Sequence, residues 1–232
     1  DTGSDNWEPA KRYLPHSARV DWFENGKPAV MPAEYYSSQY FVDKTIEHLR
    51  AGAAEGKPFF AYVGFQANHV PLQAPPEFIN KYRGRYKDGW TALRTARRDR
   101  AAALGLVPKN TPMVTMNTTS DWDKLSASEK LYEERRMEVY AGMAEAMDFH
   151  VGRLIAHLKQ TGDYDNTVFV FLSDNGTEGS DYREAQLWLV TQYSQDIDRL
   201  GAKGAYGIMG PSWASAAASP LSTYKFYARE GG

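Results

Sequence analysis

Two apolar runs each end in polar residues of types that could do chemistry. Residues 169–179 read FVFLSDNGTEG, so an apolar run delivers a carboxylate and an amide, Asp174 and Asn175, side by side. A second run, FFAYVGF at 59–65, leads into the loop QANHVPLQAPPEF, which contains His69. Carboxylate and amide oxygens favour a hard cation, Ca²⁺ or Mg²⁺, over zinc. Asp174 and Asn175 are therefore candidate metal ligands.

Each candidate also has a simpler explanation. Asp, Asn and Gly are common turn formers, so Asp174 and Asn175 also fit a polar turn at the end of a strand. A single histidine in a proline-rich loop is more often a surface or hydrogen-bonded residue than a catalytic one. The residues alone leave both questions open. No role is assigned to the other histidines, His16, His48, His150 and His157.

The two apolar runs also predict the architecture. Residues 59–65 and 168–172 have the length and continuity of strands that are buried on both faces, as in a parallel sheet. A long helical stretch separates them, and strand, helix, strand is the pattern of an α/β protein. We expect a mostly parallel central sheet flanked by helices. Because ligands bind beyond the carboxyl ends of such strands, His69 and Asp174 should lie at one edge of the sheet.

Apolar periodicity and turn residues predict the remaining elements. Ser126 and Glu129 form a capping box before a long apolar stripe, and Gly162 is placed to end that helix. The other predictions are helices at 34–54 and 88–104, a hairpin turn at 24–26, a helical pattern at 181–200 and a long loop at 201–222.

The composition excludes several classes of protein and site. The 232 residues are 42% apolar and 24% charged with a net charge of −2, which argues against a protein that binds nucleic acid through its phosphates. The basic run of Arg94, Arg97, Arg98 and Arg100 is predicted to form a solvated helix face. The absence of cysteine excludes disulfides, thiolate metal sites and a cysteine nucleophile within this stretch. No apolar run approaches the roughly 20 residues of a membrane span. Composition does not distinguish a periplasmic or secreted location from a cytoplasmic one.

Several longer stretches, taken in order, resemble one enzyme family. They are KPFFAYVGFQANHVPLQAPPEFINKYRGRYKDGW, LRTARRDRAAALGLVP, WDKLSASEKLYEERRMEVYAGMAEAMDFHVGRLIAHL, DNTVFVFLSDNG and YGIMGPSWASAAASPLSTYKFYAREGG. From residue 57 onward the chain is similar to bacterial arylsulfatases, which are sulfatases of the alkaline-phosphatase-like superfamily. The SDNG element alone would be weak evidence for the family. Its occurrence together with NHVPLQAPPEF and YKFYAREGG, in this order, is specific for it.

The resemblance implies a role for each candidate residue. Asp174 and Asn175 match two ligands of the family's divalent cation, which is usually calcium and less often Mg²⁺ or Mn²⁺. His69 matches a histidine that contacts the sulfate group, and Lys225 matches a lysine that contacts it from the far side of the pocket. A cation with Lys and His donors would neutralise charge on a sulfuryl group during transfer.

Other elements of the family pattern are missing from these 232 residues. The family's nucleophile is a formylglycine, made from the Cys or Ser of a Cys/Ser-x-Pro-x-Arg motif, and no such motif is present. A pair of Asp ligands and a Lys-x-His element are absent as well. We therefore expect residues 1–232 to be the central part of a single sulfatase catalytic domain, with the nucleophile outside this segment. The 232-residue chain alone is expected to be inactive.

The expected function is thus a sulfuric ester hydrolase that uses a divalent cation and acts on a small-molecule sulfate ester. Two alternatives stay open. The chain could be a non-catalytic module that binds a cation or an oxyanion. It could also come from a phosphate or phosphonate ester hydrolase of the same superfamily, because sulfate and phosphate esters are nearly isosteric. The sequence favours neither nucleic acid nor membrane as a partner, and it leaves the oligomeric state open.

Overall fold

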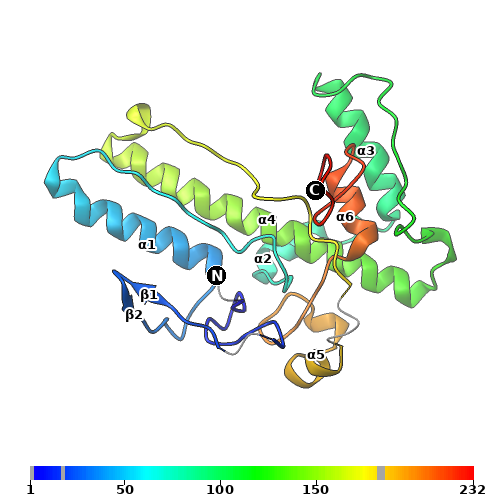
Figure 1. The fold of residues 1–232 in the computed structure, drawn as a ribbon, viewed down its shortest axis with the longest axis horizontal. Helices are drawn as coiled ribbons and strands as arrows, with labels where there is room; N and C mark the ends of the chain where they lie inside the picture. Colours follow the sequence, from blue (N-terminus) through cyan, green and yellow to red (C-terminus); the bar gives the residue numbers. More distant parts are fainter. Residues whose placement is uncertain (1–2, 17–18, 182–185) are drawn as a thin grey trace.

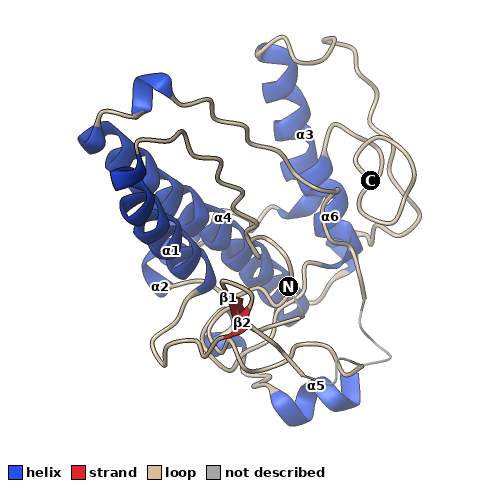
Figure 2. Ribbon diagram, turned by 60° about the vertical axis from the view of Figure 1, so that its left-hand side comes forward, coloured by secondary structure: helices blue, strands red, loops and turns tan. Residues whose placement is uncertain are grey.

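The computed structural model describes residues 3–16, 19–181 and 186–232. Figures 1 and 2 show a helix-rich molecule in which long stretches of chain connect the helices. The helices are α1 Ser37–Gly52, α2 Pro76–Ile79, α3 Gly89–Ala103, α4 Ala127–Thr161, α5 Gln186–Gln192 and α6 Gly210–Ala218. The short 3-10 helices are η1 Ala53–Glu55, η2 Asn80–Tyr82, η3 Trp122–Lys124, η4 Tyr164–Asn166 and η6 Ile197–Arg199.

Helix α4 is the element on which α1 and α2 pack. It begins with the predicted capping box: Ser126 Oγ accepts from the Glu129 amide at 3.3 Å, and the Glu129 carboxylate accepts from the Ser126 amide at 2.8 Å. It ends at Gly162, whose φ of 82° is left-handed and suits glycine. Helices α1 and α2 pack on α4, and α1 runs along it in Figure 1. The predicted helices at 34–54 and 88–104 correspond to α1 and α3.

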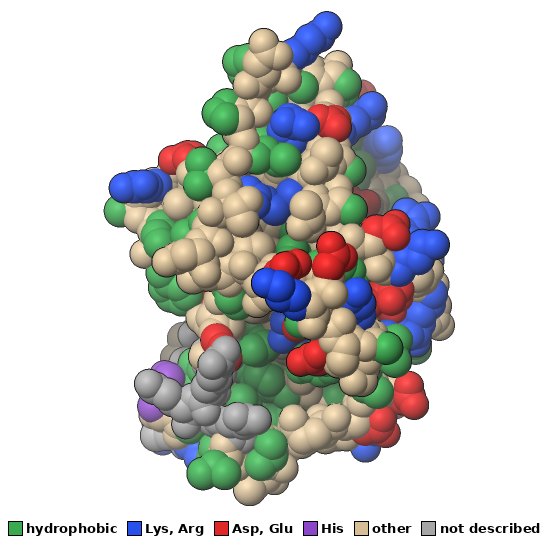
Figure 3. Space-filling model, turned by 90° about the vertical axis from the view of Figure 1, so that its right-hand side faces the viewer, with side chains coloured by type: hydrophobic (Ala, Val, Ile, Leu, Met, Phe, Trp, Pro, Cys, Tyr) green, Lys and Arg blue, Asp and Glu red, His purple; other side chains and the backbone are tan. Residues whose placement is uncertain are grey.

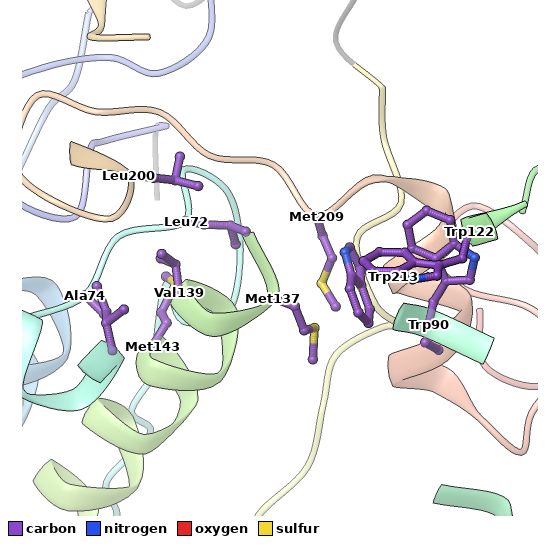
Figure 4. Packing of buried hydrophobic residues seen from close by; sticks show 12 residues of the cluster. Leu72, Ala74, Trp90, Trp122, Met137, Val139, Met143, Leu200, Met209 and Trp213 are labelled. Atoms are coloured by element: carbon purple, nitrogen blue, oxygen red, sulfur yellow. The ribbon is translucent and has the colours of Figure 1, made fainter. Parts of the chain in front are cut away.

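The main hydrophobic core joins α4 to the pair α3 and α6. Three tryptophans meet edge to face, with ring centroids 4.9 Å apart for Trp90 and Trp122 and 5.5 Å apart for Trp90 and Trp213 (Figure 4). Met137, Val139 and Met143 of α4 belong to the same cluster, together with Leu72, Ala74, Ile79, Leu200, Met209 and Ala216.

Two sequence-based predictions are wrong in this region. Residues 201–222 were expected to be a loop, but α6 occupies their middle and buries Trp213. Arg94 was expected on a solvated helix face, but only 4% of it is exposed. Its guanidinium donates to the Val114 carbonyl and to Thr115 Oγ1, and burial lowers its pKa. These backbone and hydroxyl acceptors explain how an arginine is accommodated there.

The mostly parallel central sheet is not confirmed. Residues 59–65 and 168–172 run as extended chain, but neither run pairs with another strand in the part of the protein described (Figure 1). Phe60 is 93% exposed and Val170 78% exposed, where burial on both faces was expected. The sheet that is present is the predicted hairpin, in which β1 Phe23–Glu24 pairs antiparallel with β2 Lys27–Pro28.

On the face shown in Figure 3, Lys and Arg side chains are interspersed with Asp and Glu. Among the residues with a described structure, none of the helices combines the length and apolarity needed to cross a bilayer.

Candidate functional site

The loop that carries His69 is held on the segment 201–207. The His69 amide donates to the Gln66 carbonyl at 2.7 Å and closes a turn. The amide of Leu72 donates to the Gly207 carbonyl at 2.8 Å, and that of Ala74 to the Gly201 carbonyl at 3.0 Å. These main-chain bonds fix the backbone on the carboxyl side of His69, so the ring is presented by a loop of defined shape.

Both ring nitrogens of His69 have partners. Nδ1 lies 3.1 Å from the Val70 carbonyl oxygen and 3.3 Å from the Tyr13 hydroxyl, and Nε2 lies 3.0 Å from Lys225 Nζ. Because a carbonyl can only accept, the Val70 contact assigns the proton to Nδ1. Nε2 is then free to accept a hydrogen bond from the Lys225 ammonium group.

Lys225 reaches His69 because the carboxyl-terminal segment 224–232 packs against residues 176–179. The Lys225 amide donates to the Thr177 carbonyl at 3.0 Å, and the Gly176 amide donates to the Gly232 carbonyl at 3.2 Å. The approach requires glycine, since a Cβ at Gly179 would lie 2.4 Å from the Tyr224 ring. Gly176 and Gly179 therefore allow the terminal segment to approach closely enough to position Lys225.

A third charged group, Glu178, faces both Lys225 and His69, and the sequence did not single it out. Its Oε2 is 2.9 Å from Lys225 Nζ and 3.5 Å from His69 Nε2, and its Oε1 accepts from the Ser180 amide at 2.8 Å. The residue is 7% exposed. Burial raises the pKa of Glu178, but hydrogen bonds from Ser180 and Lys225 outweigh it and leave the pKa below its ordinary value. The sequence signal that could have identified Glu178 is its position next to Gly179 in the SDNGTEG turn.

Helix α4 connects the two loops of the site through Tyr140. The Tyr140 carbonyl accepts from Asn68 Nδ2 at 3.0 Å, and its buried hydroxyl interacts with Thr177. Burial is the main reason that the pKa of Tyr140 is raised. One helical residue thus contacts the residue before His69 and the residue before Glu178, so α4 places the two loops side by side.

Asp174 and Asn175 lie in the same loop as Glu178 but take no part in this cluster. Asp174 is exposed and Asn175 half-buried, and within the described residues neither side chain makes a hydrogen bond or an ion pair. Their oxygens are of the type that Ca²⁺ prefers, but calcium takes six to eight ligand oxygens. No group of three His, Cys, Asp or Glu residues that could hold a metal occurs in the described part of the chain. The two residues fit a cation site in chemistry and are too few to complete one.

The cluster that results is suited to binding an oxyanion. Lys225 presents N–H donors and His69 presents its Nε2 from a distant part of the sequence, and both side chains are partly exposed, whereas Glu178 is enclosed. An anion arriving at the open side would meet the donors before the carboxylate. Positioned donors of this kind stabilise charge that develops on oxygen during group transfer.

Comparison with known proteins identifies the family. The sulfatase family model matches residues 3–207. The chain is 43% identical over 206 residues to an uncharacterized sulfatase of Schizosaccharomyces pombe, covering 85% of this chain and 37% of that protein. It is 34% identical over 202 residues to the arylsulfatase of Klebsiella aerogenes, covering 86% of this chain and 43% of that protein. The crystal structure of Ps i-CgsB in complex with k-i-k-neocarrahexaose superposes with a TM-score of 0.49 at 21% identity, covering 92% of this chain and 29% of that one.

The chain therefore spans less than half the length of these two sequence relatives. The match to the family model nevertheless covers most of the chain, including His69 and the turn that carries Asp174, Asn175 and Glu178. The resemblance drawn from the sequence is confirmed, and the chain belongs to the sulfatase family.

Proposed function

We propose that the full-length protein containing this chain is a sulfuric ester hydrolase of the arylsulfatase type. In this proposal, residues 1–232 form the central part of its catalytic domain. The observation that carries it is the 3.0 Å contact between His69 Nε2 and Lys225 Nζ, which joins two distant parts of the sequence. Membership of the sulfatase family supports sulfate as the group that these donors recognise.

His69 and Lys225 would bind the sulfate group and neutralise its charge during transfer. The Lys225 ammonium has three N–H donors and can turn one of them from His69 Nε2 to a sulfate oxygen. His69 Nε2, released from that contact and open to solvent, would take up a proton from water and pass it to the oxygen of the departing alcohol or phenol. The nucleophile, expected to be a formylglycine, would come from outside residues 1–232, since no Cys/Ser-x-Pro-x-Arg motif occurs here.

We also propose that Asp174 and Asn175 supply two ligands of a divalent cation, with calcium favoured by their oxygen donors. The remaining ligands would come from outside the described residues. When bound, the cation would supply positive charge beside the sulfate group. The donor chemistry of the two side chains and their place in the loop of Glu178 support this assignment.

A phosphate or phosphonate ester is the second candidate substrate class. One observation favours it: the chain is 26% identical to the multifunctional alkaline phosphatase superfamily protein PehA of Trinickia caryophylli over 182 residues. Tetrahedral sulfate and phosphate groups differ mainly in charge. A chromogenic phosphate monoester should therefore be assayed beside the sulfate ester.

The test uses a chromogenic aryl sulfate with the full-length protein and with the 232-residue chain. We expect turnover by the full-length protein and none by the short chain, with or without calcium, because covalent catalysis needs the absent nucleophile. Lys225→Ala should lower kcat of the full-length protein roughly 10²- to 10³-fold, the usual effect of removing a positioned donor. Lys203→Ala, at an exposed lysine, is the matched control and should leave kcat unchanged.

The alternatives predict different results. A full-length protein that binds sulfate without turning over any ester would support the non-catalytic binding module. Faster hydrolysis of the phosphate ester than of the sulfate ester would support the second substrate class. Robust sulfatase activity of the short chain, lost in His69→Ala, would show that the nucleophile lies within residues 1–232.

A further inference from the structure

The buried carboxylate of Glu178 is the one charged group of the site that the proposed chemistry does not use. Its two oxygens have separate partners. Oε1 is fixed by the Ser180 amide at 2.8 Å, within its own turn. Oε2 is thereby directed at Lys225 Nζ, 2.9 Å away, and at His69 Nε2, 3.5 Å away.

We propose that Glu178 is a positioning residue whose carboxylate holds Lys225, beside His69, in place as a donor to the sulfate group. The inference rests on the function proposed above. Glu178 is buried behind these two side chains, which are 34% exposed for His69 and 21% for Lys225. It therefore acts through them and does not itself contact the substrate.

The proton positions show which side chain the carboxylate holds. With the proton of His69 on Nδ1, Nε2 accepts from Lys225, and Glu178 accepts from Lys225 at the same time. When Lys225 turns its N–H groups toward a bound anion, it can keep its contact with Glu178, because an ammonium has three donors. If His69 then carries a proton on Nε2, Glu178 Oε2 is the nearest anionic acceptor.

Charge alone would give Glu178 the opposite effect on substrate binding. A carboxylate next to the site repels a sulfate ester, so its removal should strengthen anion binding. Orientation acts on turnover instead: without the carboxylate, the flexible lysine side chain loses its fixed partner, and small misplacements of a reacting group are costly. Glu178→Gln should therefore lower kcat without raising KM. A merely structural role would raise KM and lower stability.

The kinetic test uses the full-length protein and an aryl sulfate. We expect Glu178→Gln to lower kcat roughly 10- to 100-fold with KM unchanged or lower. Glu178→Asp keeps the charge and should recover part of kcat. The control is Glu47→Gln, which removes an exposed carboxylate 3.0 Å from Lys44 and should change neither constant. An unchanged kcat in Glu178→Gln would overturn the proposal, as would a rise in KM that accounts for the whole loss of kcat/KM.

A second test needs no activity and again uses the full-length protein. Nitrogen-15 NMR of the His69 ring reports which nitrogen carries the proton, and hydrogen exchange of Lys225 Nζ reports how firmly that group is held. We expect the Nδ1–H form in both proteins, because the Val70 carbonyl fixes it. Exchange of Lys225 Nζ should be slow in the parent and fast in Glu178→Gln, which lacks the carboxylate partner of Lys225. Identical Lys225 exchange in parent and variant would overturn the proposal.

The two tests separate this inference from the proposed function. If the full-length protein hydrolyses no sulfate ester, the proposed function fails, and NMR alone decides whether Glu178 holds Lys225. If the protein is active, NMR spectra that change in Glu178→Gln without a loss of kcat would show that Glu178 orients Lys225 but that this orientation does not affect catalysis. That result would overturn the inference. Circular dichroism at the assay temperature verifies that each variant is folded.

Discussion

At the scale of single residues, the His69 loop is held in place by a buried amide. Gln73 is fully buried, and its side chain serves three partners from distant parts of the sequence. Its Oε1 accepts from the Asn6 amide at 3.0 Å, and its Nε2 donates to Asp5 Oδ2 and to the Ala205 carbonyl, both at 2.8 Å. Burial raises the pKa of Asp5 despite these bonds. The network ties the amino-terminal segment to the loop that presents His69.

Replacing Gln73 with Leu should be strongly destabilising. The change leaves the three partners of Gln73 without their hydrogen bonds in a buried place, and each unsatisfied group costs about 1–3 kcal/mol. We expect the free energy of unfolding to fall by about 3 kcal/mol or more, measured by urea denaturation. The control Gln160→Leu, at an exposed position of α4, should change it by less than about 0.5 kcal/mol. A Gln73→Leu protein as stable as the control would show that the network contributes little.

Residue-scale prediction depended on motifs. His69 and Lys225 were assigned by resemblance, and the structure brings them together. Glu178 was not found, because a glutamate in a turn usually faces solvent. Its position depends on Tyr140 and the terminal segment, which enclose the turn from elsewhere in the chain. Contacts between such distant segments leave no periodic pattern in the sequence.

At the scale of elements, helix α4 contains two glycines that play different roles. Gly142 faces α2, and a Cβ there would lie 2.8 Å from the Cα and 2.9 Å from the backbone nitrogen of Ile79. These are main-chain atoms, so a rotamer change cannot relieve the clash. A Cβ at Gly152 would meet nothing within 4 Å. Gly142 therefore sets the distance between α4 and α2.

Alanine substitutions at these two glycines should have opposite effects. Gly142→Ala should lower the free energy of unfolding by about 1–3 kcal/mol, because overpacking forces the backbones apart. Gly152→Ala should raise it by about 0.5–1 kcal/mol, since alanine favours the helix without steric cost. Thermal and urea unfolding of the two variants would measure the change in the free energy of unfolding, and its sign, for each. Equal stabilisation by the two changes would contradict the close approach at α2.

The elements were predictable where the signal was local. The capping box of α4, its glycine stop and the hairpin at residues 24–26 each depend on neighbouring residues and are confirmed. Helix α6 was missed because its Gly, Ala and Ser content is typical of a loop, although its Trp213 packs against Trp90. The parallel sheet required pairing between distant segments. The extended runs 59–65 and 168–172 remain without partner strands in the described part of the chain.

At the scale of the whole molecule, the extended runs 59–65 and 168–172 expose apolar side chains on the surface. Several of their side chains are exposed, namely Phe59, Phe60, Tyr62, Val168, Phe169, Val170, Phe171 and Leu172. Contiguous exposed apolar surface promotes association, and unpaired extended backbone offers free N–H and C=O groups to a neighbour. The same surface in the full-length protein would be available to residues outside this segment.

We therefore expect the 232-residue chain to associate as its concentration rises, through these two runs. The double variant Phe60→Lys/Val170→Lys should shift the weight-average mass toward the 26.1 kDa of the monomer and reduce binding of a hydrophobic dye. The control Val30→Lys/Leu106→Lys changes two other exposed apolar residues, outside both runs, and should leave association unchanged. Analytical ultracentrifugation over a concentration series measures the mass. A parent chain that stays monomeric throughout, or a control that disperses it equally well, would show that the two runs do not drive association.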